Sequence, residues 1–259
     1  MNKKIVFCNC GVNLIDKDRL KGISDYLSQA ELPFAKISDL CFYSVDRKSE
    51  LKNLFIDSDE VLIIACYPRA VKLLLDNCGI DHPSLKFEFL NFRELSDDQI
   101  FIRIDSFFEE NDKNGEYSEF TNNTEWPSWF PIIDYSRCNT CGQCADFCLF
   151  GVYEKQNNKV VVANPKGCKN NCPACGRICP QTAIVFPKYE HKGAIAGADE
   201  FDEMAEHQRQ IQDIETILGS NIYKALEMRK AKRQSIIRSV TMKQAIAERE
   251  KALAEKNNN

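Results

Sequence analysis

The sequence has no run of about 20 apolar residues, the length that a membrane-spanning helix needs. Its N-terminal stretch is too short and too interrupted by polar residues for a signal peptide. The net charge of −4 provides no general attraction to nucleic acid. We therefore expect a cytoplasmic protein with no membrane span and no nucleic-acid partner.

Several enzyme motifs are also missing. The sequence has no phosphate-binding Walker loop, no H-E-x-x-H zinc motif and no G-x-S-x-G nucleophile motif. It has no G-x-G-x-x-G fingerprint, so no flavin or nicotinamide site is evident. The histidines His82, His191 and His207 lie far apart and adjoin no nucleophile. These absences favour a non-catalytic subunit over a self-contained enzyme.

Cysteine, in contrast, is abundant, with 13 residues. A cytoplasmic protein cannot rely on disulfides, so many thiols in a reducing compartment indicate bound metal. Eight of the cysteines form two runs, Cys138-x2-Cys141-x2-Cys144-x3-Cys148 and Cys168-x3-Cys172-x2-Cys175-x3-Cys179-Pro180.

This spacing suits two 4Fe–4S clusters. Three thiolates on a tight loop can bind three irons of a cube, and the fourth iron is out of that loop's reach. The fourth cysteine of each run then binds the other cluster. The predicted ligands form a first ferredoxin set (Cys138, Cys141, Cys144 and Cys179) and a second ferredoxin set (Cys148, Cys168, Cys172 and Cys175).

Through these runs, residues 132–187 resemble the two-cluster bacterial-type ferredoxin family. The resemblance implies electron transfer by a ferredoxin-like domain over 132–190, built from short strands and helices. Two departures are Leu149, where the family has proline after the cysteine, and one extra residue between Cys168 and Cys172. Two zinc sites with four cysteines each, or clusters with a purely structural role, remain alternatives.

Residues 1–110 alternate short apolar runs with amphipathic helical patterns, which predicts a small parallel α/β domain. One predicted helix spans 16–30, with Leu20, Ile23 and Leu27 on one face. The predicted strands are Lys4–Cys8, Phe34–Ile37, Val61–Cys66, Lys86–Phe92 and Gln99–Asp105.

Four further cysteines fall where predicted strands end, and we call them the upstream set: Cys8, Cys10, Cys41 and Cys66. The carboxyl ends of parallel strands share one edge of a sheet, where ligands bind. The upstream set could therefore hold a third cluster, or its members could be small buried hydrophobes or include a Cys8–Cys10 redox pair. Cys78 follows a predicted helix, and we expect an ordinary buried thiol at the opposite edge.

Residues 7–13 (FCNCGVN) and 64–69 (IACYPR) resemble the N-terminal domain of the flavin-carrying subunit of heterodisulfide reductase. The similarity covers residues 3–80 and departs at Tyr67, where that family has serine. It implies a third 4Fe–4S cluster on the upstream set. It also implies a place in a redox complex whose flavin is bound elsewhere.

Two segments flank the ferredoxin-like domain. Residues 111–131 read as a linker, in which Trp126 and Trp129 pack against a neighbour. Residues 197–259 read as a helical extension with an apolar stripe and a basic stretch, which is either solvated or docks an acidic protein.

The sequence thus predicts an electron-transfer subunit of a cytoplasmic hetero-oligomer, resembling heterodisulfide-reductase assemblies. Its partners would be redox protein subunits, including a flavoprotein. The alternative is a regulatory protein whose clusters sense oxygen or redox state.

Overall fold

The computed structural model describes residues 2–10, 14–80, 85–108 and 116–218. Residues 1–207 form one compact unit. Residues from 208 onward form a second unit, of which the structure describes only the end of helix α8 (Glu203–Leu218). None of the helices within these ranges has the length and apolar character needed to cross a bilayer.

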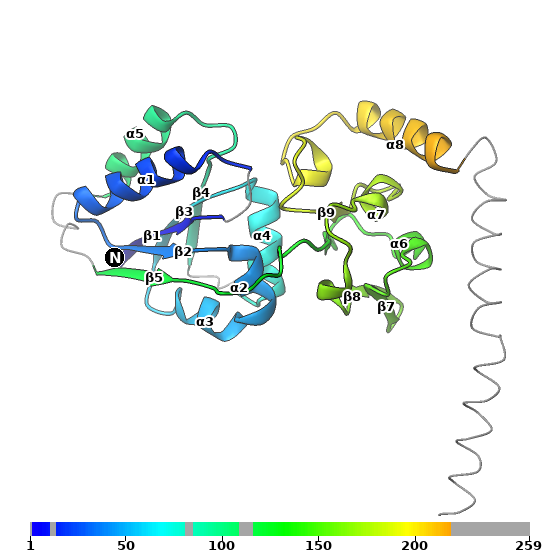
Figure 1. Cartoon of the computed structure of the whole chain (residues 1–259), viewed down its shortest axis with the longest axis horizontal. Coiled ribbons are helices and arrows are strands. Elements are labelled where there is room, and N and C mark those ends of the chain that lie inside the picture. Colours follow the sequence, from blue (N-terminus) through cyan, green and yellow to red (C-terminus); the bar gives the residue numbers. More distant parts are fainter. Residues whose placement is uncertain (1, 11–13, 81–84, 109–115, 219–259) are drawn as a thin grey trace, which may run out of the picture. The chain divides into compact units, whose positions relative to one another are not determined.

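The first part of the chain is a five-stranded parallel sheet (Figure 1). Its strands lie in the order β4-β3-β1-β2-β5, and every neighbouring pair is parallel. The bounds are β1 Lys3–Cys8, β2 Phe34–Ile37, β3 Glu60–Ala65, β4 Lys86–Asn91 and β5 Tyr117–Phe120. The predicted parallel α/β architecture is confirmed, as are the first four predicted strands.

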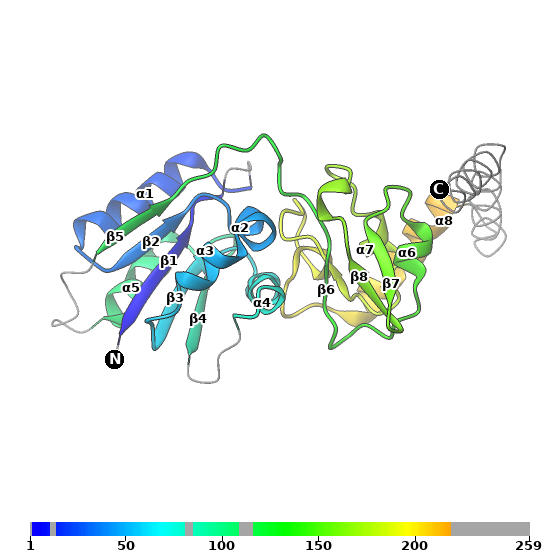
Figure 2. The same ribbon diagram turned by 90° about the horizontal axis from the view of Figure 1, so that it is seen from below.

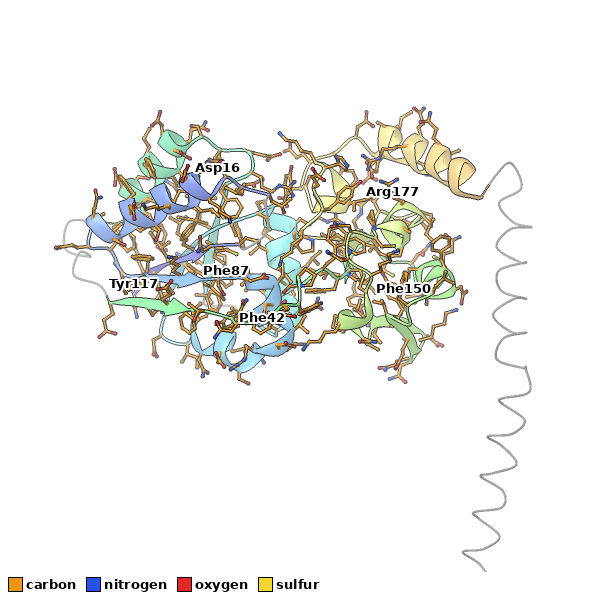
Figure 3. The ribbon with its side chains drawn as sticks, in the orientation of Figure 1. Asp16, Phe42, Phe87, Tyr117, Phe150 and Arg177 are labelled. Carbon is orange, nitrogen blue, oxygen red and sulfur yellow. The ribbon has the colours of Figure 1, made fainter. Side chains whose placement is uncertain are left out.

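The fifth predicted strand, 99–105, is wrong, because these residues lie within helix α5 (Asp97–Phe107). Ser96 caps this helix by accepting the Gln99 N–H, and the Gln99 side chain accepts the Ser96 N–H in return. Ile100 and Ile104, four residues apart, are both fully buried. The real fifth strand, β5, lies in the stretch predicted as a linker, and its Tyr117 is half exposed (Figure 3).

Helices cover both faces of the sheet. Figure 1 shows α1 and α5 on one side and α2 and α3 on the other. The predicted first helix is confirmed as α1, whose buried residues are Leu20, Ile23 and Leu27. The remaining bounds are α1 Lys17–Gln29, α2 Leu40–Asp46, α3 Lys48–Asn53 and α4 Pro68–Asn77.

The ferredoxin segment (132–190) contains two antiparallel strand pairs, β6 with β9 and β7 with β8. Helix α4 lies between this segment and the sheet (Figure 2). The bounds are β6 Ile132–Ile133, α6 Gln143–Phe147, β7 Tyr153–Gln156, β8 Lys159–Val162, α7 Ala174–Arg177 and β9 Ile184–Val185.

One buried hydrophobic core joins the start of α4 to the ferredoxin segment and to the aromatic residues before it. Tyr67 and Ala70 belong to the same hydrophobic core as Trp129 and Phe186, whose rings stack with centroids 5.1 Å apart. The predicted packing of Trp126 is also confirmed, because its ring stacks on that of Phe130 with the centroids 5.8 Å apart. Residues 126–130, the aromatic stretch before β6, therefore pack against both the sheet and the ferredoxin segment.

The C-terminal part is helical only from Glu203 onward. The prediction of helix from Gly197 is wrong for 197–202, because Gly197 has a φ of +94° that a helix cannot contain. A Cβ at this position would lie 2.6 Å from the Ala70 Cβ, so the chain needs glycine to pass close to α4. The predicted extension beyond Leu218 lies outside the described residues.

Candidate metal centres

The upstream set lies at the carboxyl edge of the sheet. Cys8 ends β1, Cys10 follows two residues later, and Cys66 directly follows β3. These neighbouring strands connect onward in opposite directions, β1 to β2 and β3 to β4, so this edge is a topological switch point. Cys41 lies in the first turn of α2, one element after β2.

The four thiols of the upstream set lie close together. The thiols of Cys8 and Cys10 are hydrogen-bonded to each other, which, together with burial, holds the pKa of Cys8 well above its usual value. Cys10 also acts electrostatically on Cys41 and on Cys66. Burial, followed by that charge, raises the pKa of Cys66 to about 12. The fold therefore brings together four cysteines that are up to 58 residues apart in the sequence (66 − 8 = 58).

Cys78 takes no part in this grouping. Its thiol donates a hydrogen bond to the Ser44 carbonyl, with the sulfur 3.4 Å from the oxygen. The charges that affect its pKa are those of Lys48 and Lys52, and burial raises that pKa. The structure thus separates Cys78 from the upstream set, in line with the sequence.

The first ferredoxin set surrounds a small cavity. All four of its cysteines line this cavity, and the apolar side chains of Ile133, Val160 and Ile184 complete its wall. Burial raises the pKa of Cys144 to about 12, with the charge of Cys179 as the next cause. The Ala183 N–H donates to the Cys179 sulfur over 3.3 Å. Gly142, with a φ of +79°, turns the chain into α6 within this loop.

The second ferredoxin set is grouped in the same way. Cys168 interacts electrostatically with Cys172 and Cys148, and burial is the main cause that raises its pKa to about 12. Cys175 interacts with Cys168 and Cys148, and also with Cys144 of the first ferredoxin set. The Tyr153 hydroxyl donates to the Cys175 sulfur over 3.0 Å. The two ferredoxin sets are therefore neighbours, as the crossed spacing predicts.

The donor chemistry of all three sets fits iron–sulfur clusters. Each set offers four thiols, and the sulfurs of Cys179 and Cys175 accept an N–H and an O–H hydrogen bond of the kind that adjusts cluster potentials. Burial raises the pKa values of Cys66, Cys144 and Cys168 to about 12, so metal binding at these three thiols must displace protons. Ligation by particular cysteines remains a prediction.

Across the described ranges, no three Cys, His, Asp or Glu side chains converge on one point where a single ion could bind. A zinc site requires that convergence, because all four thiolates bind the same ion. In a 4Fe–4S cluster each thiolate binds a different iron, so the sulfurs surround a cube instead.

Three charged residues near the upstream set were not predicted. The negative charge of Asp39 raises the pKa values of Cys8, Cys41 and Cys66, and the positive charge of Arg93 lowers the pKa of Cys66. Lys188, which belongs to the ferredoxin segment, lowers the pKa of Cys41 by its positive charge. No local pattern marks these residues, because their partners are distant in sequence.

Known proteins with similar sequences are ferredoxins. An uncharacterized ferredoxin of Methanocaldococcus jannaschii is 32% identical over 153 residues, which cover 59% of this chain and 86% of that protein. A ferredoxin of Methanothermococcus thermolithotrophicus is 41% identical over 55 residues, which cover 20% of this chain and 90% of that protein. A second uncharacterized ferredoxin of M. jannaschii is 41% identical over 54 residues, 20% of this chain and 86% of that protein. No protein-family profile and no solved structure matches the chain.

Proposed function

The chain belongs to the ferredoxin family of iron–sulfur electron carriers, and from this premise we propose that each of its two ferredoxin sets holds one 4Fe–4S cluster. The observation that carries the proposal is the grouping of the eight cysteines into the two crossed sets, one of which surrounds a cavity. A bound 4Fe–4S cluster accepts and releases a single electron.

The protein's own residues prepare the two ferredoxin sets for this chemistry. Apolar side chains such as Ile133 and Ile184 shield the first ferredoxin set from water, which lowers the local dielectric. The Ala183 N–H and the Tyr153 hydroxyl donate to ligand sulfurs and so stabilise added negative charge. Cys141 is exposed, which gives the first ferredoxin set an edge accessible to a redox partner.

We also propose a third 4Fe–4S cluster on the upstream set. Its support is the grouping of four thiols at a switch point of the sheet, where ligands of such folds bind. The resemblance of residues 3–80 to the flavin-carrying subunit of heterodisulfide reductase further suggests the setting. In that setting the chain relays electrons between a flavoprotein and a second carrier.

Anaerobic analysis of iron, acid-labile sulfide and zinc tests the clusters. We expect about twelve irons per chain in the wild type and about eight in Cys66→Ala. The matched control, Cys78→Ala, should keep about twelve, because Cys78 is buried but lies apart from the upstream set. About eight irons in all three proteins would eliminate the third cluster alone. Zinc with no iron would eliminate the whole proposal.

The wider setting is tested by affinity purification of the full chain under anaerobic conditions. A flavoprotein recovered in a fixed stoichiometric ratio supports the relay. A chain that elutes alone, with its clusters intact, contradicts it.

A further inference from the structure

Lys188 stands out as a buried ammonium next to the upstream set. Its side chain is 5% exposed, and its Nζ donates to the Asp39 Oδ2 over 2.5 Å and to the Pro127 carbonyl over 2.7 Å. Lys188 lies three residues after β9, in the ferredoxin segment, and 149 residues from Asp39 in sequence. One part of the chain therefore supplies a charge to a site built by another.

The position of Lys188 is fixed from both sides. Arg93, from the loop after β4, donates to the carbonyls of Tyr189 and Glu190 over 2.9 and 2.7 Å. Asp39 is itself held at the start of α2, where it accepts the Phe42 N–H over 3.2 Å. The ammonium can therefore move little relative to the upstream set.

Charged side chains of both signs affect the pKa values of the upstream cysteines. The Lys188 ammonium interacts electrostatically with the thiols of Cys41 and Cys10, and the positive charge of Arg93 lowers the pKa of Cys66. Asp39, the carboxylate that pairs with Lys188, has the opposite effect and raises the pKa values of Cys41 and Cys66. Burying an ammonium is costly, and a buried ion pair is weak evidence for stability. A cation kept here has its clearest use in offsetting the negative charge of four thiolates.

We propose that Lys188 is the electrostatic counter-charge of the upstream set and raises the reduction potential of the cluster held there. This inference rests on the proposed third cluster. Reduction adds one negative charge in a site of low dielectric, so a fixed cation stabilises the reduced state. Because Lys188 belongs to the ferredoxin segment, the upstream set has its full potential only with that segment docked on the sheet.

Anaerobic redox titration followed by EPR tests this role in the full chain. Lys188→Met should make the upstream potential more negative, with at least a tenfold lower ratio of reduced to oxidised cluster at the wild-type midpoint, which equals about 59 mV for one electron. Lys188→Arg should stay near wild type, since it keeps the charge. Asp39→Asn should shift the potential in the positive direction. Lys192→Met, which removes an exposed lysine four residues away, should shift nothing.

Two further comparisons distinguish an electrostatic role of Lys188 from a structural one. If Lys188→Met loses the upstream cluster, the double variant Asp39→Asn/Lys188→Met is compared with Asp39→Asn, and its potential should again be more negative. An unchanged potential in either comparison, with only faster unfolding, would make Lys188 a structural tie and overturn the proposal. A wild type with about eight irons and no third EPR signal would instead overturn the third cluster itself.

Discussion

Replacing Arg69 by methionine should loosen the ferredoxin segment from the sheet. Arg69 is the second residue of α4. Its guanidinium donates to the Asp134 Oδ2 over 2.9 Å, to the Thr182 carbonyl over 2.9 Å and to the Ala194 carbonyl over 3.4 Å. The side chains of Arg69 and Asp134 are only 11% and 9% exposed. Methionine would fill much of the volume and leave the Asp134 carboxylate buried without its cation.

The expected cost follows from that burial. Removing one partner of a buried ion pair lowers the free energy of unfolding by about 3–5 kcal/mol. Loss of iron makes unfolding irreversible, so the measurable quantity is the rate of cluster bleaching in a fixed urea concentration. If the pair is already broken in the transition state, Arg69→Met should bleach at least about a hundredfold faster than wild type.

An exposed ion pair provides the matched control. Lys155 and Asp146 pair at 3.0 Å, but their side chains are 53% and 52% exposed. Lys155→Met should therefore cost only about 0–1 kcal/mol. Adding Asp134→Asn to Arg69→Met should recover part of the loss, because no unpaired carboxylate is then buried. Bleaching of Arg69→Met at the rate of Lys155→Met would refute the reasoning.

Two other substitutions test separate features. Gly197→Ala should destabilise the protein, because the added Cβ would clash with Ala70 and because the φ of Gly197 is +94°. Gly22→Ala within α1 should instead stabilise the protein by about 0.5–1 kcal/mol, since the added Cβ meets no atom within 4 Å. Melting temperatures of the two variants that move in the same direction would contradict this. Tyr153→Phe should leave the iron content unchanged and make the potential of the second ferredoxin set more negative, by up to about 60 mV, since it removes the hydroxyl that donates to the Cys175 sulfur; an unchanged potential would show that this bond plays no part.

Hydrophobic runs predicted most of the sheet, and the exceptions have physical causes. Residues 99–105 alternate isoleucine with other residues like a strand, yet the Ser96–Gln99 capping box and the buried Ile100–Ile104 pair make them helical. Ile102, the residue that completes the strand-like alternation, is 69% exposed. Strand β5 escaped prediction because it is a short edge strand whose exposed residues alternate with half-buried ones.

The grouping of the cysteines was predictable because their spacing is local or because strand ends share an edge, whereas their ligation of clusters stays a prediction. The three loop cysteines of each ferredoxin set lie within eight residues, so one turn of chain fixes their grouping. The charged residues around the sets were not predictable. Asp39 and Lys188 are 149 residues apart, and Arg69 and Asp134 are 65 residues apart. Only the packing of the ferredoxin segment against the first part of the chain, at α2 and α4, brings these partners together.

An anaerobic spectroelectrochemical titration of the full chain tests the central claim most directly, because it counts electrons. We predict reversible uptake of about two electrons by the ferredoxin sets and about one more by the upstream set, since each 4Fe–4S cluster accepts one. The additional electron should disappear in Cys66→Ala. A chain that contains iron and sulfide but takes up no electrons reversibly would contradict a role in electron transfer.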